Sequence, residues 1–413
     1  EPTLPEKWRL IEHKLARPME FSLTGETTVI RTDNQDSFQG PVKFSLNKSQ
    51  PQQPTSSPEH APMLSRMLDQ DSDQKVSRDE AKGSLKENFA LVDSNGDGGI
   101  DLEEFTRVLT VASRQLASRE GEHTAGTESG TKVFDRVEHH MTENNGVAIH
   151  YVTLGKGPVV LFVHGFPDFW SSWREQMAAL SGEYRTVAMD TRANNKSGKP
   201  DGIKHYAMQH LLADVEAVIK DLGVESVTLV GHDWGGAIAW QFAMRFPARV
   251  NRLVICNLTH PKGYAAVRQN ATPEQKANTQ YIVDFQTPGY EDRLTPDRLT
   301  RFSAGNVSKV VRERYLTAFS KSSSKGMLDY YRAAYAALNE PEDQRPQMPN
   351  LTMPVLQFHG LKDKAVDKDG LRDTWNWIDA DYTLVTVPTS GHWIQRDAAE
   401  IVNNTMLWWL KSR

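Results

Sequence analysis

The chain has 413 residues, a length that suggests two or three domains, and a formal net charge of −5 at pH 7. This mildly acidic balance argues against a nucleic-acid-binding surface, and no apolar run approaches the ~20 residues that a membrane-spanning helix needs. The single cysteine, Cys256, lies in an apolar run, so the sequence excludes a disulfide framework and indicates a buried thiol.

Residues 1–58 are polar, and residues 48–58 are rich in Gln, Ser and Pro, which is typical of a linker. Two apolar pieces, 29–32 and 42–46, are candidates for short strands. The sequence assigns no function to this tail. The chain starts at Glu1 rather than Met, so we expect it to be either processed or trimmed.

Residues 93–104 have the spacing of a calcium-binding loop. Calcium prefers about six to eight oxygen ligands on a flexible frame, and the EF-hand loop supplies them from fixed positions. Gly98 holds the sixth position, where the loop turns sharply, and Ile100 holds the eighth, where an apolar anchor is usual. The predicted ligands are Asp93, Asn95, Asp97, Gly99 through its carbonyl, Asp101 and Glu104.

Residues 69–80 form a less regular loop of the same kind, with Val76 at the eighth position. Gln74 stands at the sixth position, where a residue other than glycine is strained, so we expect weaker binding or a partner loop that binds no calcium. The predicted ligands are Asp69, Asp71, Asp73, Lys75 through its carbonyl, Ser77 and Glu80.

Residues 59–115 therefore resemble the compact paired EF-hands of calcium-binding proteins. The resemblance implies a small all-α module that takes calcium as its ligand, with a structural or tethering role. EF-hands that suit millimolar calcium outside cells, together with the missing Met, favour an exported protein, periplasmic or secreted.

Residues 116–132 are polar and predict an interdomain linker. From residue 133 to 413, strand-like and helix-like runs alternate, which predicts an α/β domain with a mostly parallel sheet and helices on both faces. Asn145-Gly146 predicts the turn of an opening hairpin.

The stretch 226–243 organises this domain. Apolar and β-branched residues predict a buried strand over 226–230 and a buried helix over 237–243. Residues 231–235 between them read Gly-His-Asp-Trp-Gly, the pattern of a nucleophile elbow with Asp in place of Ser. Because strand and helix nearly touch at such a turn, glycines are needed there. Asp233 is the predicted nucleophile.

Two further residues complete a catalytic triad in the order nucleophile, acid, base. Asp363 follows the strand-like run 354–358, and His392 follows the run 382–387. Each residue is expected just past the carboxyl end of a strand, where open α/β sheets place their sites.

The strand-like run 158–163 leads into a loop that supplies an oxyanion-hole amide in α/β-hydrolases. The amide of Phe166 is the candidate, paired with the amide of Trp234. Phe169 and Trp170 suggest an apolar substrate pocket.

An Asp nucleophile selects the substrate class. A serine that attacked saturated carbon would form an ether, which water cannot release, whereas a carboxylate forms an ester that water hydrolyses in a second step. His392 would deprotonate that water, and Asp363 would orient the imidazole. We therefore expect epoxides or alkyl halides as substrates.

The runs 164–170, 231–236 and 391–393 resemble those of the soluble epoxide hydrolases, over residues 135–413. The resemblance implies an α/β-hydrolase fold with a helical lid, here the insertion 258–350, and the hydrolysis of a small apolar epoxide to a vicinal diol. It implies no cofactor for the chemistry.

The same resemblance implies two lid tyrosines that donate to the epoxide oxygen. It points to Tyr281, which precedes the Phe-Gln-x-Pro-Gly run 285–289, and to Tyr331, the first residue of a Tyr-Arg pair. Tyr330 and Tyr335 remain alternatives to Tyr331.

Two other functions stay open. Haloalkane dehalogenases share the Gly-His-Asp-Trp-Gly run but usually have Asn where this chain has Phe166, so hydrolysis of alkyl halides is the alternative. A calcium-dependent binding protein with an inactive hydrolase domain is the third interpretation, and the intact triad argues against it.

One loop departs from the family pattern. Residues 190–197 replace both glycines of Arg-Gly-x-Gly-x-Ser, with Ala193 and Asn195 in their places. Because alanine tolerates a left-handed conformation much less well than asparagine does, we expect this loop to differ locally.

Overall fold

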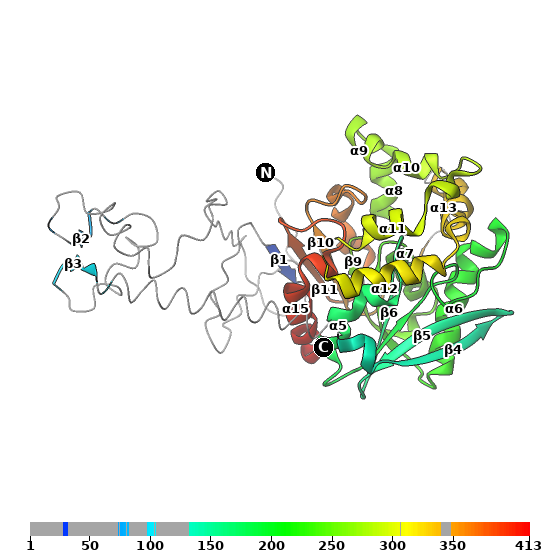
Figure 1. The fold of residues 1–413 in the computed structure, drawn as a ribbon, viewed down its shortest axis with the longest axis horizontal. Coiled ribbons are helices and arrows are strands. Elements are labelled where there is room, and N and C mark those ends of the chain that lie inside the picture. Colours follow the sequence, from blue (N-terminus) through cyan, green and yellow to red (C-terminus); the bar gives the residue numbers. More distant parts are fainter. Residues whose placement is uncertain are drawn as a thin grey trace. The chain divides into compact units, whose positions relative to one another are not determined.

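The structure is a computed structural model. It describes residues 132–305, 307–339 and 348–413 and several short N-terminal pieces, namely 28–31, 73, 75–79, 81, 97–102 and 104. The chain divides into two compact units, one of residues 48–128 and one of residues 1–47 with 129–413. The larger unit carries the wide sheet and the helices drawn in colour in Figure 1.

A nine-stranded sheet forms the centre of the larger unit. Its strands are β1 (Thr28–Arg31), β4 (Glu138–Asn144), β5 (Val147–Leu154), β6 (Val159–Val163), β7 (Arg185–Met189), β8 (Val227–His232), β9 (Val250–Cys256), β10 (Val355–Gly360) and β11 (Tyr382–Val387). The spatial order is β1-β11-β10-β9-β8-β6-β7-β5-β4. The strands from β11 to β7 are parallel, and the edge strands β1, β5 and β4 are antiparallel. The predicted, mostly parallel sheet is thus confirmed.

Both edges of the sheet agree with local sequence signals. Strands β4 and β5 form the predicted hairpin, with Asn145 and Gly146 at positive φ angles of 48° and 80°. At the other edge β1 pairs with β11, so the strand predicted over 29–32 is confirmed, one residue earlier. The candidate strand over 42–46 lies outside the described residues.

The connections place the site at a reversal of the strand order. The helices of the sheet layers are α5 (Arg174–Leu180), α6 (Met208–Asp221), α7 (Trp234–Arg245), α14 (Ile394–Asp397) and α15 (Ala399–Ser412). The chain passes from β6 to its neighbour β7 in one direction and from β8 to β9 in the other. Right-handed crossovers therefore put α5 and α7 on opposite faces, and a crevice is expected between the ends of β6 and β8.

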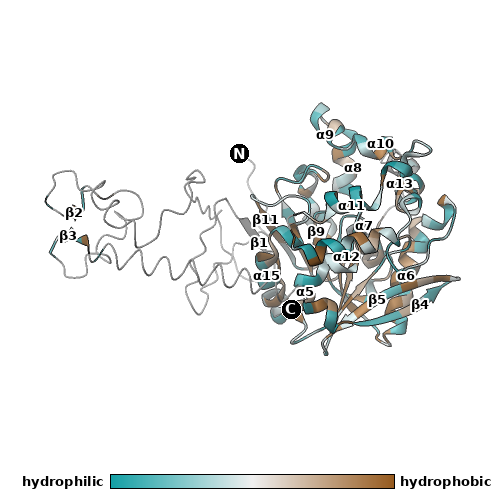
Figure 2. Ribbon diagram, viewed as in Figure 1, coloured by the Kyte–Doolittle hydropathy of each residue, from teal (hydrophilic) through white to brown (hydrophobic). Residues whose placement is uncertain are grey.

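The core lies within and around these strands. Every residue of β6, β8 and β10 is buried, and three tryptophans, Trp173, Trp240 and Trp409, are fully buried. Cys256 is buried with a free thiol, as predicted. Figure 2 shows the hydrophobic residues concentrated in strands such as β9, whereas α9 and α11 are mainly hydrophilic. None of the described helices is long and apolar enough to cross a membrane.

Six described helices lie between β9 and β10 and form the predicted lid. Residues 306 and 340–347 of this insertion lie outside the described part. The six helices are α8 (Pro261–Gln269), α9 (Pro273–Asn278), α10 (Gln280–Asp284), α11 (Pro296–Ser303), α12 (Lys309–Ser320) and α13 (Ser324–Asn339). Thr272 and Thr295 cap α9 and α11 through their hydroxyl oxygens, each followed by a proline at the first helical position. These caps explain why the insertion breaks into short helices.

In the smaller unit, β2 (Val76–Ser77) pairs with β3 (Gly99–Ile100) in antiparallel register. Val76 lies opposite Ile100, so the eighth positions of the two predicted loops face each other, and both side chains are fully buried. The predicted ligands Asp69, Asp71, Glu80, Asp93 and Asn95 lie outside the described residues.

Candidate active site

Asp233 stands at a strained turn between β8 and α7. Its φ and ψ angles are 51° and −121°, a combination that residues with a Cβ rarely adopt. A Cβ on Gly231 would lie 2.3 Å from the Gly235 carbonyl oxygen, and a Cβ on Gly235 would lie 2.0 Å from the Val163 carbonyl oxygen. The glycines on either side of Asp233 are therefore required by the close approach of strand and helix, as the sequence predicted.

The structure brings the three predicted triad residues together. Asp233 follows β8, Asp363 follows β10 and His392 follows β11. The Nδ1 atom of His392 lies 2.8 Å from Asp363 Oδ2, and its Nε2 atom lies 3.6 Å from Asp233 Oδ2. The imidazole is thus held between two carboxylates, one of which stands at the nucleophile position.

Burial and charge act in opposite directions on these groups. Burial alone would lower the pKa of His392, but Asp363 and Asp233 outweigh it and raise that pKa to about 10. Burial alone would raise the pKa of each Asp, but His392 outweighs it, and both carboxyls have a pKa below the usual range. At neutral pH the resting site therefore holds an imidazolium between two carboxylates.

The loop after β6 reaches the nucleophile. The Phe166 amide donates a hydrogen bond to Asp233 Oδ1 at 2.7 Å. A Cβ on Gly165 would lie 2.4 Å from Asp233 Cβ, so glycine is needed for this approach. In the described part no hydrogen bond joins the Trp234 amide to Asp233, and the Trp234 ring instead packs edge-on against Tyr331. Of the two predicted oxyanion-hole amides, the structure brings only that of Phe166 onto the carboxylate.

Both predicted lid tyrosines belong to one aromatic cluster above this loop. The Tyr331 ring on α13 lies 5.3 Å from the Phe166 ring and 5.1 Å from the Trp234 ring. The Tyr281 ring on α10 lies 6.0 Å from the Tyr331 ring. Burial is the largest cause that raises the pKa of both phenols well above the usual value, and the negative charge of Asp233 adds a smaller contribution to each. Both hydroxyls therefore stay protonated and able to donate.

Tyr330 points elsewhere. Its hydroxyl donates to the Arg192 carbonyl oxygen at 2.8 Å, and its ring packs against Tyr206 and Trp234. With its proton already engaged, Tyr330 is less suited than Tyr331 to donate to a substrate. The choice between Tyr331 and Tyr335 stays a prediction.

Arg332 braces the helices that carry the two tyrosines. Its guanidinium donates to the Phe285 carbonyl oxygen at 3.0 Å, to Glu291 at 2.7 Å and to Asp329 at 3.1 Å. Phe285 directly follows α10, and Arg332 belongs to α13. The Tyr-Arg pair that pointed to Tyr331 therefore also supplies a residue that joins the two tyrosine-bearing segments.

Phe169 and Trp170 do not join this cluster. The Phe169 ring packs 5.0 Å from Tyr315, and the Trp170 ring packs 5.4 Å from Phe134. Among the ring contacts of the described residues, neither side chain reaches Tyr281 or Tyr331. Both side chains are buried, and their assignment to the substrate pocket stays a prediction.

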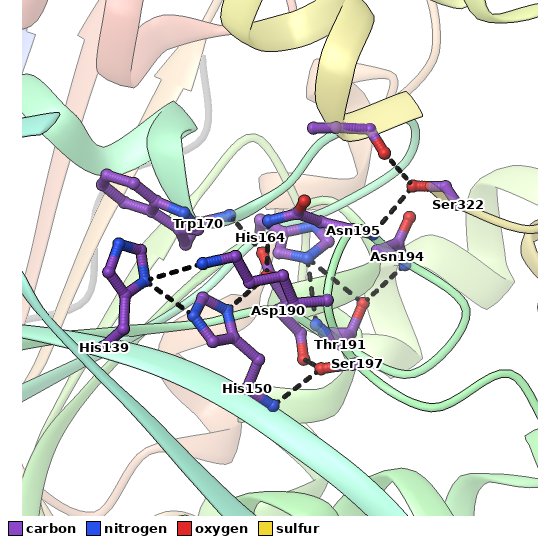
Figure 3. A network of polar contacts seen from close by, with 12 residues as sticks. His139, His150, His164, Trp170, Asp190, Thr191, Asn194, Asn195, Ser197 and Ser322 are labelled. Carbon is purple, nitrogen blue, oxygen red and sulfur yellow. Dashed lines mark hydrogen bonds and ion pairs between the residues drawn. The ribbon is translucent and has the colours of Figure 1, made fainter. Parts of the chain in front are cut away.

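Figure 3 shows side chains of the loop 190–197, whose backbone has positive φ angles at both positions where the family pattern has glycine. Ala193 has φ 71° and Asn195 has φ 43°. The Asn195 side chain donates to Asp190 at 2.8 Å, and its backbone N–H donates to Ser322, beside the lid helices, at 2.7 Å. The expected local difference therefore lies in the hydrogen bond made by the Asn195 side chain. The backbone keeps the positive φ angles that glycine would favour.

Two residues of the site escaped the sequence analysis. Asn257, after β9, donates to Asp363 at 2.7 Å, and His232 lies 2.8 Å from the His392 carbonyl oxygen through its Nε2 atom. His232 was visible inside the elbow motif. For Asn257 no pattern was available, because its role depends on three strands that are distant in sequence.

Comparison with known proteins agrees with this geometry. The family model described as alpha/beta hydrolase fold matches residues 158–399. Epoxide hydrolase 1 of Caenorhabditis elegans is 31% identical over 274 residues, which cover 62% of this chain and 66% of the relative. Epoxide hydrolase 2 of the same organism is 31% identical over 281 residues, which cover 64% of this chain and 78% of the relative.

A solved structure of similar fold is the Bacillus megaterium epoxide hydrolase in complex with an inhibitor. It has a TM-score of 0.62 and 29% identity, and the match covers 66% of this chain and 100% of that one. The family model begins at residue 158, beyond the predicted calcium loops. The chain belongs to the α/β-hydrolase fold family and, within it, to the epoxide hydrolases.

Proposed function

We propose that this protein adds water to small apolar epoxides and releases vicinal diols, through an ester formed on Asp233. The observation that carries the proposal is the set of groups around one carboxylate. An ionised Asp stands where related hydrolases carry serine, an amide donor lies 2.7 Å away, and two protonated tyrosines belong to the same cluster.

In the first step a carboxylate oxygen of Asp233 attacks one epoxide carbon, and the bond from that carbon to the ring oxygen breaks. The electron pair stays on the ring oxygen, which takes a proton from a phenol, Tyr281 or Tyr331. The imidazolium of His392 releases a proton that restores the phenol. The products are a hydroxyalkyl ester and a neutral imidazole.

The change of charge explains how His392 can act as a base. Asp233 contributes to the raised pKa of His392, and esterification removes that negative charge. The pKa of His392 falls, so the imidazole can take a proton from water, which attacks the carboxyl carbon of Asp233. The Phe166 amide stabilises the oxyanion, and removal of one such donor typically costs about 3 kcal/mol. Collapse of the tetrahedral intermediate breaks the bond to the alkyl oxygen, which takes the proton of the new carboxyl group. This releases the diol and restores the Asp233 carboxylate beside the His392 imidazolium.

Substrate tests separate epoxide hydrolysis from dehalogenation. We expect diol from a styrene-type epoxide and no bromide from a bromoalkane, because the site offers proton donors for an alkoxide. Tyr281→Phe and Tyr331→Phe should slow epoxide opening by about 10–100-fold each. Bromide release without diol would reverse the assignment. No turnover of any epoxide or halide would favour a binding protein with an inactive hydrolase domain.

The covalent step has its own test. His392→Gln should form the ester and fail to hydrolyse it, so the peptide that contains Asp233 gains the mass of the epoxide. Asp233→Ala should form no adduct and no diol. An unmodified peptide after incubation of the His392 variant would contradict the ester mechanism.

We also propose that residues 59–115 bind calcium. The supporting observation is the backbone pairing of β2 with β3, which sets the eighth positions of both loops opposite each other. Gly99 N–H donates to Asp97, and the amides of Asp101 and Glu104 exchange hydrogen bonds with each other's carboxylates. Carboxylate oxygens are the ligands that calcium prefers, and calcium would have to displace the Lys75 ammonium that pairs with Asp97 in this structure.

Calorimetry on the full chain tests this second proposal. Glu104→Gln replaces the carboxylate at the last loop position with a neutral amide and should abolish at least one calcium-binding event. A variant outside the two loops, Glu400→Gln, should bind calcium as the parent does. Unchanged binding by the Glu104 variant would refute the ligand assignment.

A further inference from the structure

Asn257 occupies a buried position at the carboxyl end of β9, next to the triad. Its side chain is fully buried and its φ angle is 43°, a conformation that asparagine tolerates better than most residues do. Its backbone N–H donates to the Phe358 carbonyl oxygen of β10 at 3.0 Å. Asn257 is therefore fixed to β10, the strand that precedes Asp363.

The amide nitrogen of the Asn257 side chain donates two hydrogen bonds next to His392. Nδ2 donates to Asp363 Oδ2 at 2.7 Å and to the Gly391 carbonyl oxygen at 3.2 Å. Asp363 Oδ2 is also the atom that faces His392 Nδ1 at 2.8 Å. The amide thus joins the carboxylate of the acid to the peptide bond that precedes the base.

The remaining oxygen of Asp363 is held by its own loop. Oδ1 accepts hydrogen bonds from the amides of Ala365 at 2.8 Å and Val366 at 3.1 Å. These bonds restrict the carboxylate but make no contact with the loop of His392. Among the hydrogen bonds of the described residues, those of Asn257 and His392 join the Asp363 side chain to that loop, while the backbone N–H of the neighbouring Lys362 donates to the Ser390 carbonyl oxygen at 3.0 Å.

We propose that Asn257 is a positioning residue that aligns Asp363 with His392 for hydrolysis of the ester. The inference rests on the proposed function, because it assigns Asn257 to one of the two half-reactions. Asn257 touches the acid and the base loop, whereas its hydrogen bonds do not include Asp233, Tyr281 or Tyr331.

The chemistry of the side chain fits this role. An amide nitrogen can donate two hydrogen bonds and carries no charge. Asn257 therefore holds Asp363 without placing a second positive charge beside the imidazolium of His392. An Asp at this position would set a second carboxylate 2.7 Å from the first, and the two would repel each other. Misalignment of a catalytic group by about 1 Å can cost on the order of 100-fold in rate.

Single-turnover kinetics test the inference in the full chain. Asn257→Gly removes both donors and adds no backbone strain at the positive φ angle. With a styrene-type epoxide we expect ester formation within about threefold of the parent and ester hydrolysis slower by about 10–100-fold. The variant should therefore accumulate the ester at steady state, detected as the mass gain of the peptide with Asp233.

The matched control lies on β9, the strand that precedes Asn257. Asn251 is exposed and bonds to Ser226 and Thr228, so Asn251→Gly should leave both rates unchanged. The amplitude of ester formation reports the folded fraction of each variant, which separates misfolding from misalignment. Asn257→Ser, which keeps one shorter donor, should hydrolyse the ester at an intermediate rate.

Two outcomes are distinguishable. Ester hydrolysis by Asn257→Gly within about twofold of the parent rate, with ester formation intact, would overturn the role of Asn257 and leave the proposed function standing. Absence of any ester in His392→Gln would overturn the proposed function and this inference together.

Discussion

At the scale of single residues, the site depends on one carboxylate in place of a hydroxyl. Asp233 is buried, yet its pKa is below the usual range because His392 outweighs the effect of burial. The reverse holds for the imidazole, whose pKa is about 10 between its two carboxylates. The same electrostatic coupling keeps Asp233 ionised and His392 protonated, and in the proposed mechanism it lasts until Asp233 has formed the ester.

This coupling predicts a measurable shift. Asp233→Asn removes one negative charge beside His392, as esterification would, so the pKa of His392 should fall from about 10 toward its ordinary value of 6.5. An NMR titration of labelled histidine would follow the change. The variant should hold a neutral imidazole at a pH where the parent holds an imidazolium.

Asp168→Asn is the control for that titration. Asp168 is another buried carboxyl, and it is not among the main charges that shift the pKa of His392. Its replacement should leave the pKa of His392 in place. Equal pKa values in the parent and the Asp233 variant would contradict the charge cycle proposed for the two half-reactions.

At the scale of elements, the tight turn between β8 and α7 fixes the position of the nucleophile. The turn needs glycine because three backbone segments meet there, namely β6, β8 and the first turn of α7. The loop 190–197 shows the opposite case. Its backbone adopts positive φ angles at Ala193 and Asn195 without glycine, and bonds from Asn195 to Asp190 and Ser322 hold it.

A pair of glycine variants tests this distinction. Gly235→Ala places a Cβ 2.0 Å from the Val163 carbonyl oxygen, a backbone atom that cannot move without displacing β6. We expect a loss of stability of roughly 3 kcal/mol or more, together with loss of turnover. Chemical denaturation and a diol assay would measure both effects.

Gly182→Ala is the matched substitution on the surface of the same domain. Nothing lies within 4 Å of the added Cβ, and the backbone needs no positive φ angle there. Stability should stay within about 0.5 kcal/mol of the parent. A Gly235 variant as stable as the Gly182 variant would show that the turn has more room than these distances indicate.

At the scale of the whole molecule, the triad, the oxyanion amide and the lid tyrosines all come from the unit of residues 1–47 and 129–413. The predicted calcium loops belong to the unit of residues 48–128. The two proposed activities therefore use separate sets of residues.

Calcium removal should separate the two activities. We expect a chelator to leave epoxide turnover of the full chain within about twofold, because calcium supplies no group to the triad. Calorimetry should show an unfolding transition that depends on calcium. At a calcium concentration of 100 times the dissociation constant, the free energy of unfolding should rise by about 2.7 kcal/mol. Loss of turnover on chelation, restored by added calcium, would instead show that the calcium loops regulate catalysis.

Much of this protein could be predicted from local patterns. The elbow, the parallel sheet, the opening hairpin, the helical lid and the order Asp233, Asp363, His392 all follow from runs of neighbouring residues, because turns and buried strands leave signals within a few positions. The loop spacing placed Val76 and Ile100 at equivalent positions, and the structure pairs them.

Other features arise only when distant segments meet. Phe169 and Trp170, predicted to line the pocket, pack against Tyr315 and Phe134, which are distant from them in sequence. The bond from Asn257 to Asp363 joins residues 106 positions apart, and that from Asn257 to Gly391 joins residues 134 apart. The sequence by itself determined which chemistry the chain can perform, since reactive side chains and turn glycines are local properties. Only the tertiary structure decided which neighbours tune and align those groups, because burial, charge and hydrogen bonding depend on the packing of separate strands.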